Sequence, residues 1–312
     1  MKIGTALPSS ATADDLLFLR QLGIEHVRVH FEAAELDPEH VARVSERFGA
    51  AGLAIASAVF KGYCAKEIAL GLPGAEEKIA DVVRFVEYMG ECGIPVLDYD
   101  FFLFAPLPET APATTRAAVT RQFDAAVADG DGSLFGRLYR ADELWENYRR
   151  FIRPVAQAAE QAGVRLALHP DDPPVPRLNG VDRILRDVDS MDRAIGLAES
   201  EAAGVLLCVG TWAEGGSAMG MDVCEAIRHY AARDQLSGVH FRNVSSPLPC
   251  FTETFLDNGY VDMAEVLATL KAVAYNGLLV PDHSPAFVGD ENGRTALAYA
   301  IGYIRGLLGA LQ

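Results

Sequence analysis

The stretches LALHPDDPP (166–174), VLLCVGT (205–211), GVHFRNV (238–244) and LLVPDHS (278–284) decide the fold of this chain. Each is a short apolar run followed by polar residues, and each supplies one side chain that can bind a divalent metal. These four candidate ligands are His169, Cys208, His240 and Asp282. A parallel β-barrel gathers its chemistry at the carboxyl ends of its strands. If the runs are strands of one barrel, residues scattered along the sequence meet in space.

The rest of the chain repeats the same unit. The predicted strands are 2–7, 26–30, 53–59, 94–99, 164–168, 204–209, 236–241 and 278–280. The predicted helices are 13–21, 38–51, 76–93, 144–162, 188–198, 221–232, 262–273 and 295–311. Strands that alternate with helices imply parallel pairing through right-handed crossovers, and eight such units close a barrel.

We therefore predict an α/β fold, a (β/α)8 TIM barrel that forms a single domain over residues 1–312. The candidate ligands lie about one βα unit apart, since a barrel of about 250 residues divides into units of about 31. An open, doubly wound sheet is the alternative. It gives no reason for ligands on four successive strands to converge.

Residues 101–143 interrupt this rhythm. They separate the fourth strand from the next helix, and loops longer than about 15 residues in compact domains are usually lids, binding loops or disordered segments. Because the segment leaves the carboxyl end of a strand, we predict an insert loop that covers the site as a lid.

Composition excludes several classes of partner. The chain has 43 acidic and 27 basic residues and a formal net charge of −16. An acidic surface repels phosphate backbones and anionic lipids, so neither nucleic acid nor a membrane is expected as a partner. No apolar run is long enough to span a bilayer and no signal-peptide pattern is present, so we expect a soluble, cytoplasmic protein. The five irregularly spaced cysteines indicate reduced thiols.

Four further residues stand beside the candidate ligands. Arg242 shares a strand face with His240, and its planar fork suits a substrate carboxylate. Asn243 and Asp171 are expected to orient substrate hydroxyls or the ligand imidazoles, and His283 to transfer protons. Each residue alone is more often structural; a lone Cys208, for example, is typical of a packed core. Their occurrence at successive strand ends favours a site.

Several motifs, in the same order, resemble the mannonate dehydratase family: HPDDPP (169–174), DRI (182–184), LLCVGT (206–211), VHFRNV (239–244), FTETFLDNGYVDM (251–263) and PDH (281–283). The resemblance implies a barrel of the xylose-isomerase type with His169, Cys208, His240 and Asp282 as ligands of a divalent metal and His283 as an acid/base residue. It implies Mn²⁺, whereas a thiolate ligand by its softness favours Fe²⁺ or Zn²⁺. The tyrosine that follows PDH in the family has no counterpart between His283 and Tyr299.

The predicted function is that of a hydro-lyase resembling mannonate dehydratase. It would remove water from a small sugar acid such as D-mannonate and give a 2-keto-3-deoxy acid. Two alternatives remain open: a divalent-metal sugar isomerase or epimerase with the same barrel, and a metal-binding homologue without turnover. The sequence leaves assembly into a homo-oligomer open.

Overall fold

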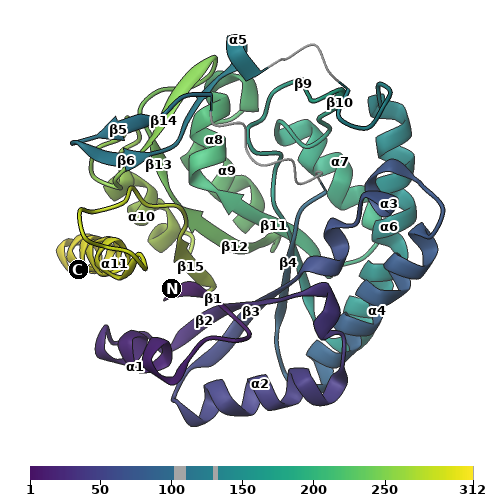
Figure 1. Ribbon diagram of the computed structural model, residues 1–312, viewed down its shortest axis with the longest axis horizontal. Helices are drawn as coiled ribbons and strands as arrows, with labels where there is room; N and C mark the ends of the chain where they lie inside the picture. The colour runs from purple at the N-terminus through teal and green to yellow at the C-terminus, as the bar shows by residue number, and fades with distance from the viewer. Residues whose placement is uncertain (102–109, 129–132, 312) are drawn as a thin grey trace.

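Eight parallel strands close into a barrel in the computed structural model, which describes residues 1–101, 110–128 and 133–311 (Figure 1). They are β1 (Lys2–Pro8), β2 (His26–Phe31), β3 (Ala54–Phe60), β4 (Val96–Tyr99), β8 (Arg165–Leu168), β11 (Ala203–Cys208), β12 (Leu236–Phe241) and β15 (Leu278–Pro281). Each pairs with the next in this order, and β15 closes the barrel against β1 with Lys2 opposite Leu278. The predicted barrel and its eight strands are confirmed.

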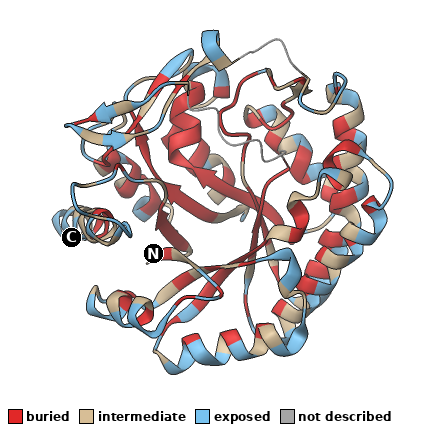
Figure 2. Cartoon of the chain, in the orientation of Figure 1, coloured by how far each residue is buried: buried red, intermediate tan, exposed pale blue. Residues whose placement is uncertain are grey.

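The predicted helices surround this barrel. They are α1 (Ala13–Gln21), α2 (Pro38–Ala50), α4 (Ala75–Glu91), α6 (Ala141–Ala162), α7 (Val188–Ala198), α9 (Val223–Ala231), α10 (Met263–Ala272) and α11 (Arg294–Ala310). Their inner faces are buried and their outer faces exposed (Figure 2). In α2 the buried residues Val41, Val44 and Phe48 lie three and four positions apart, the spacing of one helix face. None of the described helices is long and apolar enough to cross a membrane.

The segment 101–143 has more structure than the expected loop. Its described part contains β5 (Ala113–Thr115), β6 (Ala118–Thr120), β7 (Gln122–Asp124) and the short helix α5 (Ala125–Ala128), and α6 already begins at Ala141. The strand β7 pairs with β14 (Cys250–Thr254), which pairs in turn with β13 (Asn243–Val244). These strands are short and depend on partners far away in the sequence, so the local pattern could not predict them. Residues 102–109 and 129–132 of this segment lie outside the described residues.

The main hydrophobic core lies between the strands and the surrounding helices. Aromatic side chains fill part of it, with Phe60 and Phe85 stacked at a centroid distance of 4.5 Å. A much smaller apolar cluster consists of Ala56, Leu278 and Val280, from β3 and β15. Because the main core lies between the strands and the helices, it holds the helices against the barrel.

Candidate metal centre and active site

Three predicted ligands converge at the carboxyl ends of adjacent strands. His169 directly follows β8, Cys208 ends β11, and His240 lies near the end of β12. Cys208 and His240 are direct neighbours in the register of β11 and β12. The candidate ligand atoms of the three residues all lie within 4.8 Å of one another. Parallel pairing in one register thus brings together residues that are distant in sequence.

Asp282 lies at the edge of this cluster, immediately after β15. One of its carboxylate oxygens is 3.8 Å from Nδ1 of His240 and the other is 3.9 Å from Sγ of Cys208. Burial raises the pKa of Asp282, but His283, His240 and Arg242 outweigh it, and the net effect lowers that pKa below its usual range. The carboxyl group is therefore ionised and faces the other candidate ligands.

The two histidines suit a metal. Nδ1 of His169 lies 2.7 Å from the carbonyl oxygen of Pro170. Because a carbonyl only accepts hydrogen bonds, Nδ1 carries the proton and Nε2 keeps its lone pair for a ligand. The ring of His240 is buried, and neither of its nitrogens has a hydrogen-bond partner among the described residues. Burial lowers the pKa of His240 well below its usual value, which favours the neutral imidazole that binds metals.

Arg242 is the most heavily engaged side chain of the site. It is 1% exposed and is surrounded by four carboxylates, at distances of 2.6 to 3.3 Å from the guanidinium group. These carboxylates belong to Asp172, Glu214, Glu253 and Asp282. Burial raises the pKa of Glu214 well above its usual value, whereas the pKa values of the other three carboxyl groups are lowered and these groups are ionised. One guanidinium cannot neutralise three carboxylates, and unpaired buried charge is costly. A divalent cation beside Asp282 would supply the balancing charge, so the electrostatics also fit a metal.

These contacts change the role expected for Arg242. The guanidinium was predicted to bind a substrate carboxylate, yet it already contacts protein carboxylates through NH1, NH2 and Nε, and NH2 also donates to Thr211. Arg242 lies at the carboxyl-terminal opening of the barrel, directly after β12, as the strand pattern predicts. The pattern could not predict its contacts with Glu214 and Glu253, which belong to α8 (Val209–Gly215) and β14.

Asn243, whose role in substrate binding stays a prediction, makes several hydrogen bonds within the protein. Its amide nitrogen donates to the carbonyl oxygens of Leu256 and Val261, and its amide oxygen accepts from the backbone of Val244 and Val261. The side chain is 1% exposed. These bonds satisfy the donors and the acceptor of the amide, so Asn243 holds the loop after β14 in place.

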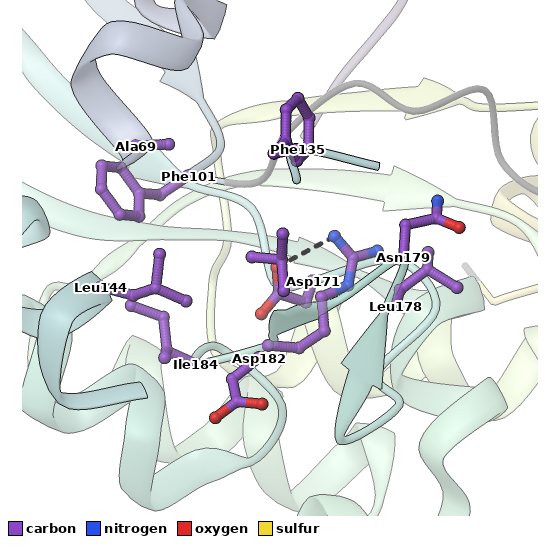
Figure 3. A pocket seen from close by; sticks show the side chains of 11 residues that line it. Ala69, Phe101, Phe135, Leu144, Asp171, Leu178, Asn179, Asp182 and Ile184 are labelled. Atoms are coloured by element: carbon purple, nitrogen blue, oxygen red, sulfur yellow. Dashed lines mark ion pairs between the residues drawn. The ribbon is translucent and has the colours of Figure 1, made fainter. Parts of the chain in front are cut away.

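Asp171 does not contact the candidate ligands in the described structure. It lies in a small separate pocket, where the dashed line marks its ion pair (Figure 3). The partner is Arg183 at 3.6 Å, and the other carboxylate oxygen accepts from the backbone of Leu185 at 2.8 Å. The neighbouring Asp172 is the residue that reaches Arg242. Adjacent residues thus direct their side chains differently, and the role of Asp171 in orienting substrate hydroxyls or ligand imidazoles stays a prediction.

His283 has a defined partner at the mouth. Its Nδ1 is 2.8 Å from Oε1 of Glu253 and its Nε2 is 3.6 Å from Oδ1 of Asp282. Arg121, from the segment between β6 and β7, also approaches Nδ1, at 3.4 Å. Burial lowers the pKa of His283, but the carboxylates of Asp282 and Glu253 prevail and raise it above its usual value. Neither Glu253 nor Arg121 is among the residues predicted from sequence, although Glu253 lies inside the motif FTETFLDNGYVDM (251–263).

The barrel and its donor set define the class of protein. A closed (β/α)8 barrel carries a histidine, a thiol and a second histidine at its carboxyl-terminal mouth, and solved barrels of the xylose-isomerase type share this fold. One of these, a xylose isomerase domain protein from Planctomyces limnophilus, superposes with a TM-score of 0.65 at 16% identity, over 99% of this chain and 97% of that one.

Comparison of sequences identifies the family. Residues 136–312 match the family model described as D-mannonate dehydratase (UxuA), and the chain belongs to this family. It is 30% identical to the mannonate dehydratase of Streptococcus pneumoniae (strain 70585) over 254 residues, which cover 72% of this chain and 68% of that protein. The Lactococcus lactis subsp. cremoris (strain MG1363) mannonate dehydratase is 25% identical over 93% of this chain and 91% of its own length. The crystal structure of mannonate dehydratase from Streptococcus suis serotype2 superposes with a TM-score of 0.88, at 23% identity over 100% of this chain and 93% of that chain.

Replacement of the buried guanidinium should destabilise the protein. We predict that Arg242→Met lowers the free energy of unfolding by about 3–5 kcal/mol, because it leaves buried carboxylates unpaired. Burial already raises the pKa of Glu214 well above its usual value, despite Arg242. Protonated carboxyl groups tolerate burial. The difference in the free energy of unfolding between Arg242→Met and the wild type should therefore shrink as the pH falls and grow as the pH rises.

Urea unfolding of the metal-free protein at several pH values measures this effect. The matched control is Arg84→Met, because Arg84 is 50% exposed and pairs with Asp81 on the surface; its loss should cost at most about 1 kcal/mol. Equal stability of the two variants would contradict the role given to Arg242.

Proposed function

We propose that this protein is a metal-dependent hydro-lyase that removes water from D-mannonate or a closely related sugar acid and forms a 2-keto-3-deoxy acid. The convergence of His169, Cys208 and His240 within 4.8 Å, with Asp282 beside them, carries this proposal. Membership of the D-mannonate dehydratase family supports it. The reaction takes a proton from the carbon next to the substrate carboxylate and returns one to the departing hydroxyl.

In this proposal the four residues hold the metal, and Mn²⁺ is the expected ion, with Fe²⁺ or Zn²⁺ as alternatives. When bound, a divalent ion would supply Lewis-acid stabilisation of the negative charge that develops on the substrate as the proton leaves. Burial raises the pKa of the Cys208 thiol, although Arg242 acts in the opposite direction. The thiol of Cys208 must therefore lose its proton for binding, and metal affinity should rise with pH.

His283 is the proposed proton-transfer residue. Glu253, an ionised acceptor, takes the hydrogen bond from Nδ1, so Nε2 is the atom that exchanges a proton with the substrate. The carboxylate of Glu253 stabilises the protonated form of His283 through this hydrogen bond, and protonated His283 can protonate the leaving hydroxyl. Arg242 acts indirectly, since it holds Glu253 and Asp282 in place.

Arg121 is the proposed contact for the substrate carboxylate. It lies at the mouth beside His283, its residue is exposed, and its segment is anchored where the backbone of Glu253 donates to its carbonyl oxygen. Guanidinium groups pair with carboxylates in a planar, bidentate manner. This role replaces the one expected for Arg242.

A sugar isomerase or epimerase is the second candidate function. Tyr299 and Tyr303 both lie in α11, and the hydroxyl of Tyr299 contacts Arg116. If neither tyrosine transfers a proton, dehydration would need another residue beside His283 as its second proton-transfer group.

Four further expectations stay predictions. They are a single domain over residues 1–312, a lid formed by residues 101–143, a cytoplasmic location and assembly into a homo-oligomer.

The first test measures turnover. Protein stripped with a chelator should be inactive, and added Mn²⁺ should restore formation of the 2-keto-3-deoxy acid from D-mannonate, detected by a colorimetric or mass-spectrometric assay. Parallel samples with Fe²⁺ and Zn²⁺ identify the preferred ion. Stoichiometric metal without any product would argue against the lyase and in favour of the isomerase, epimerase or binding alternatives.

The second test separates metal binding from proton transfer. His169→Ala and Asp282→Ala should each lose most bound metal together with activity, because a ligand is removed. His283→Asn should keep its metal and lose turnover by about 10²–10⁴-fold, the usual contribution of a general acid or base. Elemental analysis and kcat report the two properties; full activity of His283→Asn would disprove its role.

The third test concerns substrate recognition. Arg121→Met should raise KM for the sugar acid by more than tenfold and leave the metal content unchanged, because one charge-assisted contact is lost. Arg116→Met, in the same segment, is the matched control: Arg116 pairs with Asp257 instead of approaching His283. An unchanged KM for Arg121→Met would remove Arg121 from the substrate site.

A further inference from the structure

A cavity of about 140 Å³ lies inside the barrel, below the candidate metal centre. At one end it is bounded by residues that precede or begin strands, namely Lys2, Pro95, Asn276 and Gly277. At the other end it reaches His240. The cavity therefore extends from the amino-terminal rim of the barrel to a residue of the metal centre.

Small side chains leave this space open. A TIM barrel usually fills its interior with layers of bulky branched residues, whereas here the lining includes Ala56, Ser57, Ser237 and Gly238. A Cβ atom on Gly238 would lie 2.7 Å from Cδ1 of Leu206 and 4.0 Å from Oδ1 of Asp98. A larger residue at position 238 would thus crowd Leu206 and enter the cavity.

Apolar side chains such as Leu278 and Val280 line part of the cavity, and several buried polar groups line the rest. Asp98 is 2% exposed, and its Oδ2 accepts hydrogen bonds from Arg28 at 2.7 Å and Ser57 at 2.9 Å. Its other oxygen, Oδ1, has no partner among the described residues, and the same holds for Oγ of Ser237 and both ring nitrogens of His240. Buried polar atoms are nearly always hydrogen-bonded to protein or to ordered water. A cavity with several unpaired polar atoms and room for more than one water has the features of a site that binds ordered water.

His240 needs a second partner as well. A histidine that binds a metal through one nitrogen almost always donates its other N–H to a carboxylate, a carbonyl or a water. For His169 that partner is the carbonyl of Pro170. Neither ring nitrogen of His240 has a hydrogen-bond partner among the described residues, but the ring borders the cavity.

We propose that the cavity is a structural water site, in which ordered waters link Asp98 and Ser237 to the outer ring nitrogen of His240 and so orient this residue. The chain of contacts runs from Arg28 and Ser57 through Asp98 to the waters. It supports the metal centre from inside the barrel, on the side opposite the substrate. The inference rests on the proposed function only in that His240 is taken as a metal ligand.

A crystal structure of the wild-type protein at high resolution tests the water site directly. Ordered waters within hydrogen-bond distance of Asp98 Oδ1, Ser237 Oγ and a ring nitrogen of His240 are expected. A dry cavity, or waters that contact none of these atoms, would overturn the proposal. This result does not depend on activity or on which metal is bound.

Filling the cavity tests the support of His240. Ala56→Leu should displace the waters and weaken Co²⁺ binding by about 10–100-fold, the usual effect of losing such an outer partner. The absorption bands of bound Co²⁺, including the thiolate band of Cys208, report both affinity and geometry. The matched control is Ala54→Leu on the same strand, which is exposed and does not line the cavity.

Unchanged Co²⁺ affinity and spectrum in a folded Ala56→Leu protein without cavity waters would overturn the proposed role of the waters. If Ala56→Leu does not fold, Ser237→Ala replaces it, since it removes one anchor of the waters without adding volume; an unchanged spectrum and affinity would then count against the proposal. Failure of the wild type itself to bind Co²⁺ would instead contradict the proposed metal centre.

Discussion

The mouth of this barrel depends on one buried cation, Arg242. Its guanidinium contacts Asp172 after β8, Glu214 in α8, Glu253 in β14 and Asp282 after β15, so it connects four separate segments of the chain. A buried guanidinium is stable only when its donors are paired, and the buried carboxylates need it equally. The excess of negative charge that remains is the strongest electrostatic reason for a divalent cation at this position. The same buried charged groups therefore hold the four segments together and favour a bound metal.

The two sides of the site are built differently. On the side of the barrel interior, rigid parallel strands place His169, Cys208 and His240, and a cavity with several buried polar groups lies beneath His240. On the open side, Glu253 in β14 and Arg121 just before β7 lie next to His283, and β7 pairs with β14. A rigid base suits a metal, whose ligands must hold their geometry. A surface assembled from connecting segments can vary, and in barrels of this kind such segments decide which substrate is bound.

Much of the fold and part of the site could be predicted from sequence. The strand from Leu236 to Phe241 was predicted with its observed bounds, because a short apolar run between helical patterns is a local signal. His169, Cys208 and His240 could be predicted to meet because parallel strands in one barrel have their ends at one face. The β5–β6 hairpin and β7 could not be predicted, since three-residue strands carry little periodicity and are stabilised by distant partners.

The sequence by itself determined the barrel, its eight strands and the donor residues at the strand ends, because hydrophobic periodicity and chain order are local properties. Only the tertiary structure decided how those side chains are used. It turned Asp171 toward Arg183 and Asp172 toward Arg242, satisfied Asn243 with backbone groups, and placed Glu253 against His283. Neighbouring residues such as Asp171 and Asp172 have the same chemistry, and which partner each meets is set by packing between segments far apart in the sequence.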